Sequence, residues 1–340
     1  MTTVDVPITS RKDWMSDQEV RWCPGCGDYS ILAAVQLLMP DLGVKRENTV
    51  FVSGIGCAAR FPYYMNTYGM HSIHGRAAAV ATGLAVARPD LDVWVISGDG
   101  DSLSIGGNHL IHALRRNVNF TMLMFNNQIY GLTKGQYSPT SEIGKVTKST
   151  PFGSVDTPFN PISLALGAEA TFVARTHDMD RAHMLETFKR AHEHKGAAFV
   201  EVYQNCNVFN DGAFEAVTAK ENRSDNLIPL VHGEKIIFGA NSDKCVAPDK
   251  QGHFQVMNVA DVEESAIVVH DETLERPGHA FSLSRLATGP HEPTPVGVFR
   301  AVNHADYGSL VGDQLVEAQA KGGSGDLSKL LRSGATWTVD

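Results

Sequence analysis

The sequence predicts an α/β fold in which a parallel sheet carries helices on both of its faces. Between residues 49 and 206, short runs rich in β-branched and aromatic residues alternate with segments of helical periodicity. This alternation is typical of parallel strands joined by crossover helices. A length of 340 residues and a hydrophobic content of 43% allow one large core with an appendage. We therefore expect a domain over residues 1–218 and a C-terminal extension over residues 219–340 that wraps it.

The individual elements follow from their composition and flanking residues. The expected strands are residues 49–54 (TVFVSG), 91–97 (LDVWVIS), 119–126 (NFTMLMFN), 170–175 (ATFVAR) and 198–203 (AFVEVY), and the expected helices are residues 28–39, 76–88, 106–117 and 178–196. The last helix begins at an aspartate cap and ends at Gly196. After residue 218 the pattern weakens into short apolar segments, with one short capped helix at residues 324–334. Because crossovers are right-handed, the carboxyl ends of the strands share one edge, where ligands of open α/β sheets bind.

Composition and charge exclude several classes of function. A net charge of -9 without a basic block argues against nucleic acid or an anionic membrane as the main partner. The N-terminal segment mixes charges of both signs, and no run of eighteen apolar residues occurs. We therefore expect a soluble cytoplasmic protein. In that compartment the five cysteines favour metal or redox chemistry over a disulfide framework.

Two polar motifs follow neighbouring strands of the expected sheet. Asp99 follows one strand and Asn127 the next, and the intervening residues suffice for one turn, one helix and one strand. Gly98 and Gly100 let the backbone turn sharply and approach a ligand closely. Carboxylate and amide oxygens are ligands that Mg²⁺ takes together with diphosphate oxygens. Either motif alone fits an ordinary turn, but the pair at this separation indicates a magnesium–diphosphate site.

The pair of motifs also resembles the thiamine-diphosphate signature, which begins with Gly-Asp-Gly and ends with Asn-Asn about thirty residues later. The resemblance implies that Mg²⁺ is held by Asp99, the Asn127 side chain and the Ile129 carbonyl. It also implies a set of residues around the diphosphate: Gly98, Gly100, Asp101, Gly131 and Leu132.

Four cysteines are expected near the same edge. Cys23 and Cys26 lie in WCPGCGD, whereas Cys57 and Cys206 follow expected strands. Four thiolates suit either a [4Fe-4S] cluster or a structural Zn²⁺, and their spacing alone does not separate these metals. A four-cysteine Zn²⁺ site is more often built from two close Cys-x-x-Cys pairs, whereas this chain has only one. This spacing favours an iron–sulfur cluster. Cys245, in the extension, is expected to be an ordinary thiol.

Taken together, the motifs resemble those of the β subunits of 2-oxoacid:ferredoxin oxidoreductases. The segments that carry the resemblance, in family order, are WCPGCGD, SGIGC, HGRA, GDGD, GGNH, FNNQIYGLTKGQYSPT and QNCN. They cover about the first two thirds of the chain. The resemblance implies thiamine diphosphate, Mg²⁺, and a [4Fe-4S] cluster on Cys23, Cys26, Cys57 and Cys206.

This resemblance also implies a reaction and its partners. The 2-oxoacid is decarboxylated oxidatively, coenzyme A receives the acyl group, and ferredoxin receives electrons through the cluster. The segment YGLTKGQYSPT resembles the corresponding segment of family members that act on 2-oxoglutarate. Their reaction gives succinyl-CoA and CO₂ and is reversible in principle. An α subunit is implied to contribute the pyrimidine-binding domain and its glutamate. We therefore expect an αβ or (αβ)₂ assembly, an inactive isolated chain, and an extension that wraps the domain or contacts the α subunit.

Three further side chains are candidates for catalysis. His74, just before a helix, matches a family histidine and could contact a phosphate or polarise a reacting group. Lys134, after the metal-binding loop, could bind the distal carboxylate of 2-oxoglutarate. Arg60, three residues after Cys57, could orient substrate or neutralise charge near the cluster. The structural alternatives are a buried hydrogen-bonded histidine and two solvated surface cations.

Three other functions remain open at this stage. One is a non-redox thiamine-dependent decarboxylase or synthase whose four cysteines hold Zn²⁺. Another is a member of the same family that prefers pyruvate. The last is an electron-transfer or assembly subunit that keeps the fold without catalysis.

Overall fold

The computed structural model describes residues 10–286 and 292–339. Its strands are β1 Thr49–Ser53, β2 Tyr68–His71, β3 Asp92–Gly98, β4 Phe120–Asn126, β5 Phe172–His177, β6 Ala197–Tyr203, β7 Leu227–Leu230, β8 Ile237–Phe238, β9 Lys244–Pro248, β10 Phe254–Asn258 and β11 Thr294–Ala301. Its α-helices are α1 Asp28–Leu38, α2 Ala77–Ala87, α3 Asp99–Leu103, α4 Gly107–Arg115, α5 Pro161–Gly167, α6 Arg181–Glu193, α7 Glu215–Thr218, α8 Lys220–Asn226, α9 Gly278–Ser284, α10 Tyr307–Gly322 and α11 Leu327–Leu331.

The described residues form a mostly parallel central sheet of eight strands in the order β2-β1-β3-β4-β6-β5-β11-β7. Strands β1 to β6 run parallel, while β11 is antiparallel to β5 and pairs in parallel with β7. The predicted α/β fold and all five expected strands are confirmed. Strand β2 was not expected, because its four residues are all exposed at the edge of the sheet and carry no apolar run.

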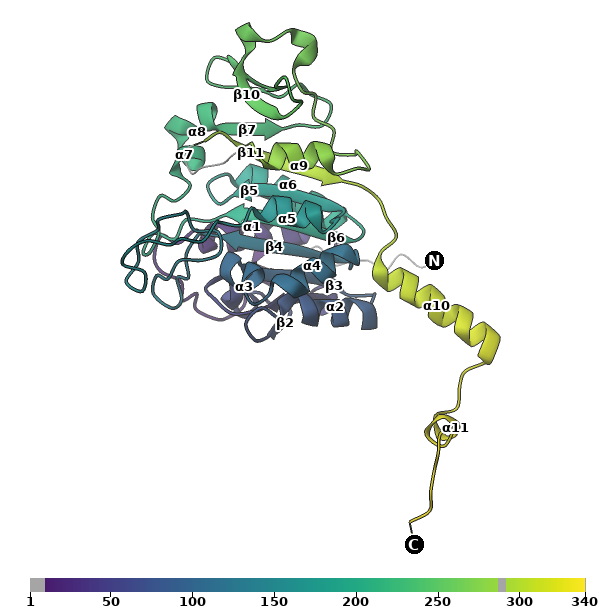
Figure 1. Ribbon diagram of the computed structural model, residues 1–340. Helices are drawn as coiled ribbons and strands as arrows, with labels where there is room; N and C mark the ends of the chain where they lie inside the picture. The colour runs from purple at the N-terminus through teal and green to yellow at the C-terminus, as the bar shows by residue number, and fades with distance from the viewer. Residues whose placement is uncertain (1–9, 287–291, 340) are drawn as a thin grey trace.

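Helices cover both faces of this sheet (Figure 1). Buried side chains of its inner strands alternate between two cores, one on each face. Val93 and Val95 of β3 join the core beneath α2, α4, α5 and α9. Trp94 and Ile96 of the same strand join the core beneath α1 and α6. The helix expected over residues 178–196 is shorter at both ends, Arg181–Glu193. Its aspartate cap is Asp180, whose side chain accepts a hydrogen bond from the His183 backbone N–H at 3.1 Å.

The C-terminal part of the chain contributes to the main sheet. Strands β7 and β11 extend it beyond β5, and nearly all residues of β11 are buried. Within the described ranges a second sheet of three strands, in the order β10-β9-β8, lies beside β7 (Figure 1). Helices α10 and α11 project away from the body (Figure 1). No helix among the described residues is long and apolar enough to span a lipid bilayer.

Candidate cofactor site

Asp99 lies at the junction of β3 and α3, at the carboxyl edge of the sheet. The preceding Gly98 pairs with Phe125 of β4, so the two strand ends lie side by side. The Asp99 carboxylate is buried and accepts a hydrogen bond of 2.6 Å from the hydroxyl of Thr140. Burial raises the pKa of Asp99 to about 6, and hydrogen bonds from Ser138 and Thr140 oppose that rise. A buried carboxylate without a cationic side chain in contact favours a bound cation.

The turn after β4 supplies the other predicted metal ligands. Asn127 Oδ1 accepts a hydrogen bond of 3.2 Å from the backbone N–H of Ile129, and Gln128 between them has a positive φ of 56°. Two carbonyls of the turn already have donors: Asn210 Nδ2 lies 2.9 Å from the Asn127 carbonyl, and Ser141 Oγ lies 2.6 Å from the Gln128 carbonyl. The Ile129 carbonyl accepts no hydrogen bond from any described residue. The turn therefore presents the amide oxygen and one free carbonyl at the same edge as the buried carboxylate.

One of the expected glycines, Gly100, lies where a side chain would not fit. A β-carbon at Gly100 would lie 2.2 Å from the ring of Tyr130, whose hydroxyl donates to the Gly100 carbonyl at 3.1 Å. Gly98 has extended backbone and caps α3. A β-carbon at Gly131 would point at the cysteine sulfurs described below. Leu132 is half exposed at the mouth of a neighbouring cavity.

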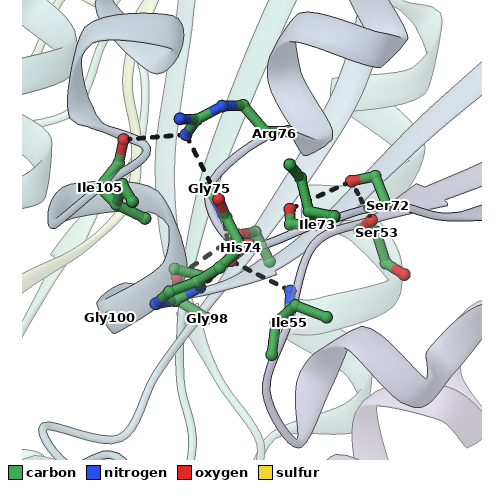
Figure 2. A network of polar contacts seen from close by, with 12 residues as sticks. Ser53, Ile55, Ser72, Ile73, His74, Gly75, Arg76, Gly98, Gly100 and Ile105 are labelled. Atoms are coloured by element: carbon green, nitrogen blue, oxygen red, sulfur yellow. Dashed lines mark hydrogen bonds and ion pairs between the residues drawn. The ribbon is translucent and has the colours of Figure 1, made fainter.

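His74 lies beside Gly98 and Gly100 (Figure 2) and forms a hydrogen-bonded pair with Asp101. His74 Nδ1 lies 2.5 Å from Asp101 Oδ1, and this carboxylate oxygen also accepts the backbone N–H groups of Ile55 at 3.0 Å and Gly75 at 2.7 Å. Asp101 Oδ2 accepts the hydroxyl of Ser97 at 2.5 Å. The carboxylate of Asp101 is thus occupied by protein donors that hold two loops together, and its predicted place around a diphosphate stays a prediction. The pairing directs His74 Nε2 away from Asp101.

The four predicted cysteine ligands lie in one group. A β-carbon on Gly131 would lie 3.5 Å from Cys206 Sγ and 3.6 Å from Cys57 Sγ, so these two sulfurs flank the same glycine. Burial raises the pKa of Cys57 to about 12, and among the further groups that raise this pKa are Cys206 and Cys23. Burial also raises the pKa of Cys26, to which Cys206 and Cys57 again contribute. Each thiol is therefore an electrostatic neighbour of at least one other in the group.

Hydrogen bonds fix the loops that carry these cysteines. The Trp22 indole N–H donates to the Cys57 carbonyl at 2.7 Å, and Gln204 Nε2 lies 3.3 Å from Cys26 Sγ. Over residues 10–286 and 292–339, no group of three or more His, Cys, Asp and Glu side chains is arranged to hold one metal ion. A [4Fe-4S] cluster binds each thiolate to a different iron, so it does not require the tight tetrahedron of a Zn²⁺ site. Cys245 lies apart from this group, buried in β9.

The other two catalytic candidates lie on separate cavities. Arg60 lines a cavity of about 490 Å³ together with Tyr63, His71 and Leu132. Lys134 lines a cavity of about 710 Å³ that also contains Ile129 and two further lysines, Lys145 and Lys148. Lys134 therefore lies beside the metal-binding turn, on a locally basic surface of a protein with a net charge of -9. The structure brings Lys134 close to the predicted metal ligands and Arg60 close to the Cys57 loop.

Several side chains of the site were not found from the sequence. Thr140 and Asn210 contact the predicted metal ligands from loops that follow β4 and β6, and Gln204 lies between Asn127 and Cys26. Of these three residues, only Gln204 could have been found from the sequence, because it lies two residues before the predicted cluster ligand Cys206.

Comparison with a family model gives a match over residues 54–202 to the description "Thiamine pyrophosphate enzyme, C-terminal TPP binding domain". The matched segment contains both polar motifs and Cys57. It ends just before the strand end that leads to Cys206.

Comparisons with individual proteins give relatives that cover from about half of the chain to nearly all of it. The chain is 57% identical over 341 residues to 2-oxoglutarate oxidoreductase subunit KorB of Mycobacterium tuberculosis, covering 98% of this chain and 91% of that protein. It is 46% identical over 192 residues to the 2-oxoacid:ferredoxin oxidoreductase subunit beta of Saccharolobus solfataricus, covering 56% of this chain and 63% of that subunit. A solved structure of 2-oxoglutarate:ferredoxin oxidoreductase from Magnetococcus marinus, with 2-oxoglutarate, coenzyme A and succinyl-CoA bound, matches with a TM-score of 0.76 and 32% identity. That match covers 98% of each chain.

Proposed function

This chain belongs to the β subunits of the 2-oxoacid:ferredoxin oxidoreductases, and we propose that it acts with an α subunit on 2-oxoglutarate. The proposed reaction is coenzyme A-dependent oxidative decarboxylation, which yields succinyl-CoA, CO₂ and reduced ferredoxin. The relatives named for 2-oxoglutarate support this substrate over pyruvate.

One observation carries the proposal: the predicted metal-binding turn lies beside the sulfurs of Cys57 and Cys206 at one edge of the sheet. Gly131 lies two residues after Ile129, and its missing side chain would be 3.5 Å and 3.6 Å from the Cys206 and Cys57 sulfurs. An enzyme that passes electrons from a coenzyme to a cluster needs both groups within a short distance. The shared edge provides that proximity, whereas a purely structural Zn²⁺ site would not need to lie beside the coenzyme.

The residues of the metal-binding turn fit a Mg²⁺–thiamine diphosphate group. Asp99 supplies a buried carboxylate, Asn127 an oriented amide oxygen, and Ile129 a carbonyl without a hydrogen bond from the described residues. These are hard oxygen donors of the kind that Mg²⁺ prefers. When bound, thiamine diphosphate supplies the electron sink for removal of CO₂ from a 2-oxoacid. These residues would hold the metal, and the missing side chain of Gly100 leaves room for the Tyr130 ring beside them.

Cys23, Cys26, Cys57 and Cys206 are proposed to hold a [4Fe-4S] cluster. Their mutual electrostatic influence and the two sulfurs that flank Gly131 support a shared ligand. The fixed loops around them would keep the four thiolates in place when the cluster changes its charge.

The three catalytic candidates are proposed to act from different sides of the cofactor. Because Asp101 accepts from His74 Nδ1, the His74 ring is oriented with Nε2 available to a phosphate or a reacting group. Lys134, on the basic cavity beside Ile129, would bind the distal carboxylate of 2-oxoglutarate. Arg60, in the cavity beside the Cys57 loop, would balance negative charge near the cluster or orient substrate.

The α subunit is proposed to contribute the pyrimidine-binding domain, in an αβ or (αβ)₂ assembly located in the cytoplasm. Residues 1–218 would form the cofactor domain and residues 219–340 an extension of it. Strands β7 and β11 of the extension complete the edge of the main sheet, which supports a structural role for that part of the extension.

The test is anaerobic purification of the chain co-expressed with its α subunit, followed by metal and cofactor analysis and steady-state assays with 2-oxoglutarate and pyruvate. We expect iron, sulfide, magnesium and thiamine diphosphate, a higher kcat/KM for 2-oxoglutarate, and no activity in an Asp99→Ala variant. The matched control is Asp313→Ala, on the projecting helix α10, which should keep activity. A colourless zinc protein, or full activity of Asp99→Ala, would contradict the proposal.

A further inference from the structure

Gln204 lies between the proposed metal ligand Asn127 and the proposed cluster ligand Cys26. It directly follows β6, and Asn127 directly follows β4. The preceding residues of the two strands, Tyr203 and Asn126, are paired in the sheet. The two side chains therefore leave neighbouring strand ends at the same level. Gln204 is 1% exposed, so its amide must find its hydrogen-bond partners inside the protein.

The orientation of the Gln204 amide follows from the backbone of the metal-binding turn. Asn127 Oδ1 accepts the N–H of Ile129, so Asn127 Nδ2 is the group that faces Gln204. Asn127 Nδ2 donates to Gln204 Oε1 at 2.8 Å. Gln204 Nε2 must then point the other way, where its two hydrogens meet the Asn205 carbonyl at 2.5 Å and Cys26 Sγ at 3.3 Å. Because a carbonyl oxygen can only accept a hydrogen bond, the group that faces the Asn205 carbonyl must be Gln204 Nε2. This contact independently fixes the same orientation of the Gln204 amide.

Each end of this amide acts on one cofactor site. The Oε1 end holds the Asn127 side chain so that its own oxygen stays on the side of the Ile129 N–H, where the proposed Mg²⁺ site lies. Outer-shell contacts of this kind orient metal ligands and tune their affinity. The Nε2 end donates to a cysteine sulfur, and hydrogen bonds to the sulfurs are among the factors that set the reduction potential of an iron–sulfur cluster.

We infer that Gln204 is a positioning residue that serves both cofactors, orienting Asn127 toward Mg²⁺ through Oε1 and raising the reduction potential of the cluster through its hydrogen bond to Cys26 Sγ. This inference rests on the proposed function, since it assumes that both cofactors bind. Gln204 binds neither cofactor itself, yet on this inference it affects both the Mg²⁺ affinity and the reduction potential of the cluster, which the proposed function does not specify.

Two substitutions separate the two roles. Gln204→Leu removes both the acceptor and the donors. Gln204→Glu keeps an acceptor for Asn127 Nδ2 but loses the donor to the sulfur and adds negative charge beside the thiolates. The matched control for added charge is Gln255→Glu, at an exposed position on the distant strand β10 (Figure 1).

The experiment uses the assembled complex with its α subunit. Reduction potentials are measured by anaerobic spectroelectrochemical titration. Mg²⁺ affinity is measured by titrating Mg²⁺ into chelator-treated complex at a fixed concentration of thiamine diphosphate. We expect both Gln204 variants to have a more negative potential than the wild type. We expect Gln204→Leu alone to bind Mg²⁺ about ten- to a hundredfold more weakly, and Gln255→Glu to match the wild type in both properties.

A Gln204→Leu complex with wild-type potential and Mg²⁺ affinity would overturn the inference, and so would a Gln204→Glu complex with an unchanged potential. If the leucine variant does not assemble, Gln204→Met replaces it in both measurements, because methionine keeps the length of the side chain but has neither the acceptor for Asn127 Nδ2 nor the donor to Cys26 Sγ. The wild-type complex separates this test from that of the proposed function. A wild type without iron refutes the function, whereas a wild type with its cluster and unaffected variants refutes only the role of Gln204.

Discussion

Replacing Thr140 by valine removes one hydroxyl from the metal site while keeping the shape of the side chain. That hydroxyl lies 2.6 Å from Asp99 Oδ2 and 2.9 Å from Asn126 Oδ1. Its single hydrogen serves one acceptor at a time, and the shorter contact is with the carboxylate. Valine therefore removes one of the donors that stabilise the charged form of the buried Asp99, while Ser138 remains.

The expected loss follows from the strength of this contact. A hydrogen bond to a charged group contributes about 1.5–3 kcal/mol, which corresponds to roughly a ten- to hundredfold change in a binding constant. We therefore expect Thr140→Val to raise the pKa of Asp99 and to weaken Mg²⁺ binding by up to that factor at pH values below this pKa, where the proton competes with Mg²⁺ for the carboxylate. The assay is Mg²⁺ titration of the chelator-treated complex with thiamine diphosphate present. The matched control is Thr82→Val, whose hydroxyl bonds to its own helix α2 and lies outside the site.

The pH dependence gives a second readout for the same variant. Burial raises the pKa of Asp99 to about 6, and Mg²⁺ competes with the proton for the carboxylate. Mg²⁺ affinity should therefore fall as the pH drops through about 6. Because the Thr140 hydrogen bond lowers this pKa, its removal should move the fall to higher pH. A Thr140→Val complex with wild-type Mg²⁺ affinity at every pH would refute the role given to the hydroxyl.

Three more changes have defined outcomes. Lys134→Ala should raise the KM for 2-oxoglutarate roughly tenfold or more, by loss of a charged hydrogen bond, while the KM for pyruvate is unchanged. Steady-state assays that find an unchanged preference would remove this role. Gly131→Ala should lower iron and sulfide per protomer, because its methyl group would lie 3.6 Å from Cys57 Sγ where the cluster is expected; full cluster content would contradict that placement. Glu201→Gln should lower the urea midpoint of unfolding by an amount equivalent to about 3–5 kcal/mol, because it leaves the buried Arg175 unpaired; an unchanged midpoint would show that the pair contributes little.

The sequence predicts the parts of this molecule that depend on local pattern. The strands from β1 to β6, apart from the exposed β2, have continuous apolar runs because both faces are covered, and such runs are visible without a structure. The edge on which Asp99, Asn127, Cys57 and Cys206 gather also follows from the handedness of crossovers.

Contacts between distant loops could not be predicted in the same way. Thr140 lies 41 positions from Asp99, and Gln204 lies 178 positions from Cys26, so nothing in local spacing brings them together. The direction of a side chain is equally hidden. Helix α3 begins at Asp99, and its first turn directs the Asp101 carboxylate toward the loops of Ile55 and Gly75, which the sequence does not indicate.

In the C-terminal extension, the sequence also does not predict which strand of the main sheet a distant segment joins. Strand β11 reaches the main sheet more than ninety residues after β6, and it runs antiparallel to β5. Its sequence is apolar, but no rule of local connection specifies which strand it joins. The short pieces between β7 and β10 are too small to carry a recognisable period.

In the proposed function, thiamine diphosphate and the [4Fe-4S] cluster lie at one edge of the sheet and exchange electrons. The most direct measurement is the visible absorption of the anaerobic, oxidised complex after mixing with 2-oxoglutarate, without ferredoxin. If electrons pass from the coenzyme to the cluster, the iron–sulfur absorption will bleach, and Asp99→Ala will abolish the bleaching. Release of CO₂ from 2-oxoglutarate with no change in the cluster absorption would contradict this electron transfer.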